Sequence, residues 1–201
     1  DDTSAGKKVR KHLLAAAQAF LGGDTTALDP MWFDEALSAY VARGGESAAR
    51  VLLDRALASE DPVFRPAALA AVAGSGNKAV ARWLLYDLAD PRLRISERHD
   101  AFGSIIMTRM TRDIGYDWIS ANFDSVTSAN SGIFLARRLP GLFGRFCSVA
   151  KADEIAALYR PRFAGTPGAL ELERVIETIR NCGTLETARG AIISKDFAAL
   201  K

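Results

Sequence analysis

The sequence predicts an all-α fold built from antiparallel helix hairpins, and three observations lead to this prediction. Apolar residues recur at helical spacing along most of the 201 residues. The pair Asp-Pro recurs at Asp29-Pro30, Asp61-Pro62 and Asp90-Pro91, so that each interval of about 30 residues has room for two helices. No stretch alternates apolar and polar residues between hairpin turn dipeptides, as a strand of a small sheet would.

In the first half of the chain, helix starts and stops can be assigned from local signals. A first helix carries apolar residues as far as Phe20-Leu21. After Asp29, a good N-cap, and Pro30, a good first helical residue, the apolar positions of the next helix lie on one face until Gly44-Gly45 ends it. Pro66 should delay the start of a later helix or kink it. The remaining helices expected here span about residues 46–57, 62–73 and 77–88.

The second half stays helical but is less regular. The expected helices span about residues 95–109, 113–123, 131–143, 149–160, 168–182 and 185–199. We therefore expect one helical-repeat domain over residues 1–201, with regular hairpins in 1–110 and a different pattern in 111–201. Such hairpins stack into a right-handed superhelix of the kind found in HEAT and armadillo repeats.

Charge and hydropathy argue against two classes of partner. The chain has 26 basic and 24 acidic residues, a net charge of +2, whereas nucleic-acid binders concentrate more positive charge. A basic cluster, Lys7 to Lys11, could touch an anionic surface, but it also fits a solvated helix end. No apolar run approaches the roughly 20 residues of a membrane span. We expect neither nucleic acid nor membrane as a partner.

The compartment stays open at this stage. The first residues show no signal peptide, and they look like an internal cut or a processed start. We expect a piece of a longer protein, which could be cytoplasmic, periplasmic or secreted.

The sequence shows no catalytic constellation and no metal site. The two histidines, His12 and His99, have no second ligand at metal spacing and fit solvated helix faces. HExxH, GxSxG, P-loop and GxGxxG patterns are absent from the sequence. Cys147 and Cys182 are expected to be small buried hydrophobes, because a disulfide would need an oxidising compartment. We therefore assign no catalytic, metal or cofactor residue to this chain.

Two adjacent arginines lie in an otherwise apolar predicted helix. Arg137 and Arg138 point about 100° apart on a helix, so one can reach solvent while the other approaches an inner wall. A guanidinium on such a wall could receive a carboxylate. It could equally pair with an Asp or Glu of a neighbouring helix.

Several segments of the second half resemble a known family when they are taken in order. They are Gly115–Asp124 (GYDWISANFD), Gly132–Arg137 (GIFLAR), Arg145–Ser148 (RFCS), Asp153–Ile155 with Leu158–Tyr159, and Leu172–Asn181 (LERVIETIRN). This series resembles the C-terminal helical domain of gluzincin-type zinc aminopeptidases, which include aminopeptidase N and the puromycin-sensitive and endoplasmic-reticulum aminopeptidases. The matching family positions, to which we give structural roles, are Trp118, Asn122, Phe123, Glu177 and Asn181. The chain departs from the family pattern after Asn181, where a tryptophan usually follows, and at Pro140-Gly141.

The resemblance implies a non-catalytic domain of a longer enzyme. Such enzymes hold zinc with HExxH and a distant Glu, and bind the peptide amino terminus with GxMEN; neither motif occurs in these residues. The resemblance also implies that the domain packs against the catalytic domain of the same polypeptide, encloses a cavity and limits which peptides enter. Arg137 is the candidate for that wall.

Two other readings compete with this one. A free-standing helical-repeat module would use its concave face for a protein partner. A helical-repeat nucleic-acid binder would need a basic stripe, which the net charge disfavours.

Overall fold

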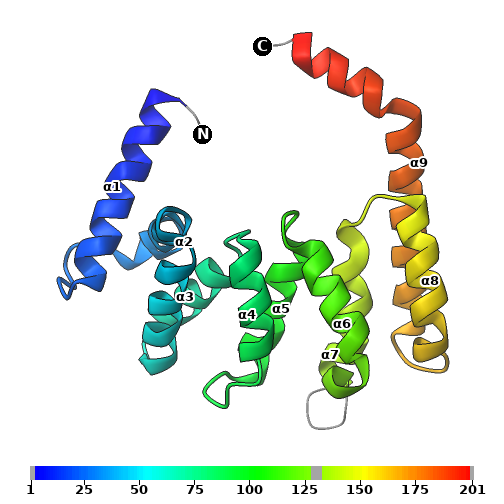
Figure 1. The fold of residues 1–201 in the computed structure, drawn as a ribbon, viewed down its shortest axis with the longest axis horizontal. Coiled ribbons are helices and arrows are strands. Elements are labelled where there is room, and N and C mark those ends of the chain that lie inside the picture. The colour runs from blue at the N-terminus through cyan, green and yellow to red at the C-terminus, as the bar shows by residue number, and fades with distance from the viewer. Residues whose placement is uncertain (1–2, 128–132, 200–201) are drawn as a thin grey trace. The chain divides into compact units, whose positions relative to one another are not determined.

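The computed structural model describes residues 3–127 and 133–199, and of residues 133–136 the backbone alone. Nine α-helices and no strand occupy these residues, which confirms the all-α prediction (Figure 1). The helices are α1 (Ser4–Leu21), α2 (Phe33–Ala58), α3 (Phe64–Ala73), α4 (Lys78–Asp87), α5 (Ile95–Met107), α6 (Arg112–Thr127), α7 (Ile133–Leu142), α8 (Val149–Phe163) and α9 (Ala169–Ala199). The right-handed superhelical path stays a prediction.

The chain forms two compact units, Asp1–Ser120 and Ala121–Lys201, here called the N-terminal and C-terminal units. The boundary lies inside α6, next to Asn122, whose φ of −115° and ψ of 16° depart from helical values. The sequence predicts the change from regular hairpins to a different pattern slightly earlier, after residue 110. Whether the two units make up one domain stays a prediction.

The three Asp-Pro pairs form the same local turn, which leads into a 3-10 helix (Pro30–Trp32) after Asp29, into α3 after Asp61, and into a turn that ends before α5 after Asp90. One carboxylate oxygen of Asp29 accepts a hydrogen bond from the backbone N–H two residues ahead, at 2.8 Å. Asp61 and Asp90 repeat this bond at the same distance. Each carboxylate thus satisfies a backbone donor of the turn that follows it. Pro66 lies in the first turn of α3, where it costs no helical hydrogen bond, and the helix starts two residues later than predicted.

Aromatic and aliphatic side chains fill the core of the N-terminal unit. Phe20, Phe33 and Phe64 bring α1, α2 and α3 together, with ring centroids 5.1–5.7 Å apart. Gly45 adopts a φ of 61°, which breaks α2 into two helical segments as the Gly44-Gly45 pair predicts. Each of the first hairpins therefore buries one face against the next.

A buried arginine joins α2, α3 and α5. The side chain of Arg65 is 4% exposed and forms a bidentate ion pair with Glu97, at 2.7 and 2.9 Å. Its remaining donors bind the carbonyls of Ala56, Leu57, Ser59 and Arg92. The guanidinium hydrogen bond lowers the pKa of Glu97, so the carboxylate stays charged despite its burial. The arginine also satisfies backbone carbonyls that the end of α2 leaves open.

In the C-terminal unit α8 and α9 lie side by side and antiparallel (Figure 1). Their buried faces meet through Ile155 and Tyr159 on α8 and Leu172, Ile176 and Ile179 on α9. The ring of Tyr159 also packs on those of Phe143, Phe123 and Phe163. This aromatic cluster forms one end of the unit and reaches the pocket described below.

Two expectations about the end of the chain are wrong. The helices expected over 168–182 and 185–199 are one continuous helix, α9, because Gly183 keeps helical geometry inside it. The cysteines are not buried hydrophobes: Cys147 is half-buried, Cys182 is exposed, and the two form a disulfide. The short connection before α8 passes against α9 and thereby brings two residues 35 positions apart into contact.

Candidate functional site

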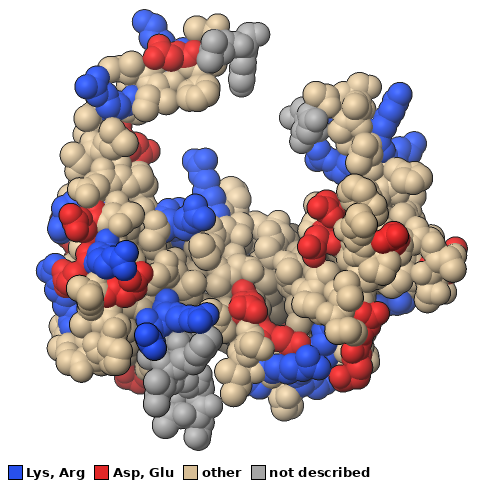
Figure 2. Space-filling model, turned by 180° about the vertical axis from the view of Figure 1, so that it is seen from behind, with Lys and Arg blue, Asp and Glu red and all other residues tan. Residues whose placement is uncertain are grey.

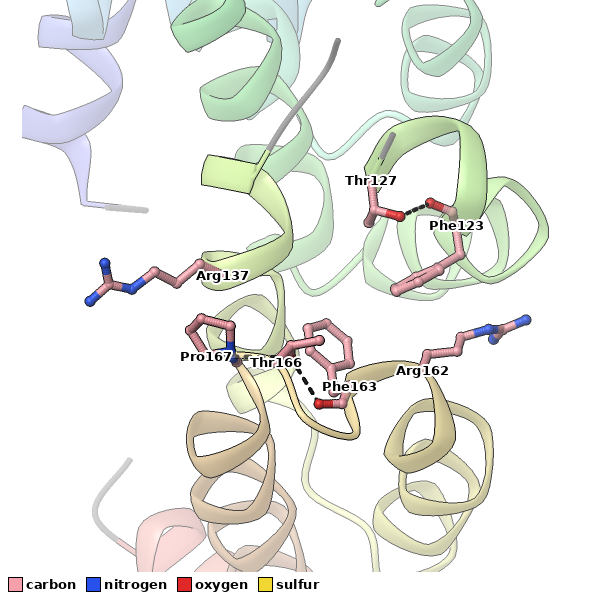
Figure 3. A pocket seen from close by; sticks show the side chains of 8 residues that line it. Phe123, Thr127, Arg137, Arg162, Phe163, Thr166 and Pro167 are labelled. Carbon is pink, nitrogen blue, oxygen red and sulfur yellow. Dashed lines mark hydrogen bonds between the residues drawn. The ribbon is translucent and has the colours of Figure 1, made fainter. Parts of the chain in front are cut away.

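A pocket of about 380 Å³ opens in the C-terminal unit, where α6, α7 and the α8–α9 connection meet. Its floor is apolar, because the rings of Phe123 and Phe163 are both buried. Figure 3 shows Phe163, Thr166 and Pro167 in the middle, with Arg137 and Arg162 extending away from one another on opposite sides. Among the described residues that line the pocket, none is Asp or Glu. The pocket therefore combines an apolar centre with positive charge at its rim.

Arg162 is held by the aromatic cluster. Its guanidinium carbon lies 5.2 Å from the ring centroid of Phe123 and 5.7 Å from that of Tyr159. Both distances are within the range of cation–π attraction. Arg162 is exposed, so its guanidinium N–H donors can reach a group in solution.

The two threonines of the pocket are occupied by their own backbone. The hydroxyl of Thr127 donates to the carbonyl of Phe123, and that of Thr166 donates to the carbonyl of Phe163, both at 2.8 Å (Figure 3). Thr166 in turn accepts from the N–H of Gly168 at 3.3 Å. These bonds shape the turns at the pocket edge and leave the arginines as its main donors. The arginines and phenylalanines among its described lining residues can bind an acidic group together with an apolar one.

The structure places Arg137 at this pocket as an exposed side chain. Arg138 is exposed as well, and the role of Arg137 in a cavity wall stays a prediction. None of the ion pairs within the described residues involves Arg137. Both readings of Arg137, as a receptor for a carboxylate and as the partner of an acid on a neighbouring helix, therefore stay predictions.

The other family positions are scattered rather than gathered in one site. Trp118 is half-buried, with its ring centroid 5.7 Å from that of Phe102. Phe123 is buried in the pocket floor, and Asn122 marks the break in α6. Glu177 and Asn181 are exposed on α9. In the matching segment of α7, Gly132 lies outside the described residues.

Sequence reasoning missed Arg162 and the α8–α9 connection. The signal that could have identified them is the run Pro161 to Gly168 (PRFAGTPG), in which turn residues follow directly after an arginine and a phenylalanine. Loops lie on the surface and often carry binding residues, so this run could have been singled out.

Other features of the described residues bear on function. They contain no group of three or more His, Cys, Asp or Glu side chains that could hold a metal. None of the helices in the described ranges is long and apolar enough to cross a bilayer. On the face shown in Figure 2, Lys and Arg side chains lie among Asp and Glu side chains, and neither sign forms a continuous stripe.

The comparisons with known proteins agree with the series of motifs in the second half of the chain. The family described as ERAP1-like C-terminal domain matches residues 3–181, which is most of the sequence. No curated protein matches the chain. The match includes the segments from Gly115 to Asn181 that carry the resemblance, and it extends over the N-terminal hairpins as well. The chain therefore belongs to the ERAP1-like C-terminal domain family.

Proposed function

We propose that this chain is the non-catalytic C-terminal domain of a zinc-dependent aminopeptidase, where it encloses the substrate cavity and limits the access of peptides. The observation that carries this proposal is the family match over residues 3–181. The partners are then the catalytic domain of the same polypeptide and the peptide substrate. In such enzymes a zinc-bound water attacks the first peptide bond, with the metal ligands supplied from outside this chain.

The pocket in the C-terminal unit supports a contact with the substrate. A peptide carries carboxylates, at its C-terminus and on acidic side chains, next to apolar side chains. The pocket is lined by the exposed Arg137 and by the buried rings of Phe123 and Phe163. A charge-assisted hydrogen bond from Arg137 to a peptide carboxylate would hold the part of the substrate that lies away from the cleaved bond. Remote binding of this kind favours long peptides over short ones.

The proposal that zinc and catalysis belong to residues outside this chain can be tested by measuring metal content and peptidase activity. We expect the full-length protein to bind one zinc per chain and to release the first residue of peptides. We expect residues 1–201 alone to bind no stoichiometric zinc and to cleave no aminoacyl reporter. Elemental analysis and a reporter assay on both proteins make the comparison. Tightly bound zinc in the isolated chain, or a full-length protein without peptidase activity, would contradict the proposal; the second result would favour a free-standing interaction module.

A further inference from the structure

The disulfide lies where α9 changes from a packed helix to an exposed one. Up to Ile179, every turn of α9 buries a side chain against the rest of the C-terminal unit. Gly183 is the last buried residue of the helix, and Cys182 directly precedes it. Residues 184–199, here called the arm, contain no buried residue. The disulfide is therefore a covalent tie at the root of the arm.

Close backbone packing accompanies this tie. A Cβ added to Gly183 would lie 2.6 Å from the backbone nitrogen of Val149 and 2.8 Å from backbone atoms of Ser148. Only glycine allows α9 to approach the connection before α8 so closely. Cys147 precedes Ser148, and its Cα lies 5.0 Å from that of Cys182. The backbone contact and the disulfide thus fix the same turn of α9.

The arm lacks the means to hold its own helical structure. It is 16 residues long, has no buried side chain, and contains Gly190 at its centre. Isolated helices of this length are marginal in water, because the first turn is costly to form. A helix that continues from an already fixed turn avoids that cost. The order of the arm therefore depends on the turn that the disulfide fixes.

We propose that the Cys147–Cys182 disulfide is a reducible tether that controls whether the arm of α9 is ordered. In the oxidised form the last packed turn is fixed and the helix continues into the arm. In the reduced form only the backbone contact of Gly183 holds this turn, so the turn opens more often and the arm frays with it. The first half of α9 keeps its place, because its buried face and the Arg160–Glu173 and Arg180–Asp153 ion pairs do not depend on the disulfide.

The two cysteines differ in exposure, and this difference determines which sulfur a dithiol attacks first. Cys182 is exposed on α9, so a thiolate of the dithiol attacks its Sγ and forms a mixed disulfide. The Cys147 sulfur leaves with the bonding electron pair. Cys147 directly precedes Ser148, the N-cap of α8, and a helix N-terminus stabilises a thiolate leaving group. The second thiol of the reagent then displaces Cys182, so that the dithiol is oxidised to its disulfide and the chain carries two thiols.

This tether is closed in oxidising compartments and opens where thiols are kept reduced. Whether the arm is helical or frayed therefore depends on the redox state of the solution around the protein. It is independent of the peptidase proposal, because the argument uses only the α8–α9 packing and the disulfide.

Hydrogen exchange measured by mass spectrometry tests the tether on the full chain. Exchange of the amides of residues 183–199 is compared without and with dithiothreitol. We expect exchange in this segment to rise by about tenfold or more on reduction, whereas amides of residues 170–179 change by less than about twofold. The Cys147→Ser/Cys182→Ser double variant should show the fast exchange under both conditions, which controls for effects of the reductant itself.

Three outcomes would overturn the proposal. One is equal exchange of residues 183–199 in the oxidised and reduced wild-type chain. Another is an equal rise throughout α8 and α9, which would make the disulfide a general brace. The last is the finding of two free thiols after alkylation of the protein isolated without reductant. If the double variant does not fold, the reduced wild-type chain, checked by circular dichroism, carries the comparison alone.

Discussion

Replacing Arg65 with methionine should destabilise the N-terminal unit strongly. The guanidinium is almost fully buried and binds both oxygens of Glu97 together with four backbone carbonyls. Methionine has a similar apolar stem but offers no donor. The substitution leaves a carboxylate that is 12% exposed without its cation, and it strands the carbonyls at the end of α2.

The expected loss is about 3–5 kcal/mol of the free energy of unfolding, the usual cost of removing one member of a buried ion pair. For a chain of this size, this corresponds to a fall in Tm of about 10 °C. Arg65→Lys keeps the charge but cannot bind the carboxylate and the carbonyls at once, so it should lose less, about 2 kcal/mol.

Urea unfolding followed by circular dichroism gives the free energies. Arg82→Met is the matched control, because Arg82 is exposed on α4 and should change stability by less than about 0.5 kcal/mol. If Arg65→Met and Arg82→Met lost the same small amount, the view of Arg65 as the link between α2, α3 and α5 would be refuted.

Three further predictions follow from the packing and charge. Glu97 has a pKa below its ordinary 4.5, so the stability that its charge contributes is complete at neutral pH and is lost as the pH falls through the lowered pKa. Urea unfolding between pH 7 and about pH 3 should therefore show a shallower decline of the unfolding free energy for Glu97→Gln than for the wild type. Gly183→Ala should cost about 1–3 kcal/mol of unfolding free energy, because the added Cβ meets rigid backbone. Gly190→Ala in the same helix should be neutral or stabilising by up to about 1 kcal/mol. Changes of the same sign and size in the two variants would count against the close packing at Gly183. Trp118→Ala should cost about 1–3 kcal/mol, less than a fully buried tryptophan, because the side chain is half-buried and its ring contacts that of Phe102. A thermal melt unchanged from the wild type would show that this packing contributes nothing.

Local signals were sufficient to predict the helices of the first half. The Asp-Pro pairs and Gly45 act on their own neighbours, through a capping carboxylate or a positive φ, so their effect can be read without the tertiary structure. The family segments likewise identified the family that matches residues 3–181.

Features that depend on distant residues were missed. Gly183 suggested a helix end, because nothing in the nearby sequence shows that α9 must pass close to the backbone of Ser148. The same contact brings Cys147 and Cys182 together, and their spacing of 35 residues alone gives no indication of it. Arg137 was identified as a candidate, but Arg162 lines the same pocket because α8 and α6 meet through Tyr159 and Phe123.

The contact between the pocket and the substrate is the central functional claim, and kcat/KM of the full-length protein tests it most directly. The measurement compares a ten-residue peptide with a short aminoacyl reporter, for the wild type, Arg137→Ala and the exposed-arginine control Arg82→Ala. We predict that Arg137→Ala loses about fivefold on the long peptide, since an exposed charge-assisted hydrogen bond is worth about 1 kcal/mol, and nothing on the reporter. Arg82→Ala should match the wild type on both substrates. Equal losses on both substrates, or no loss on the long peptide, would contradict the account.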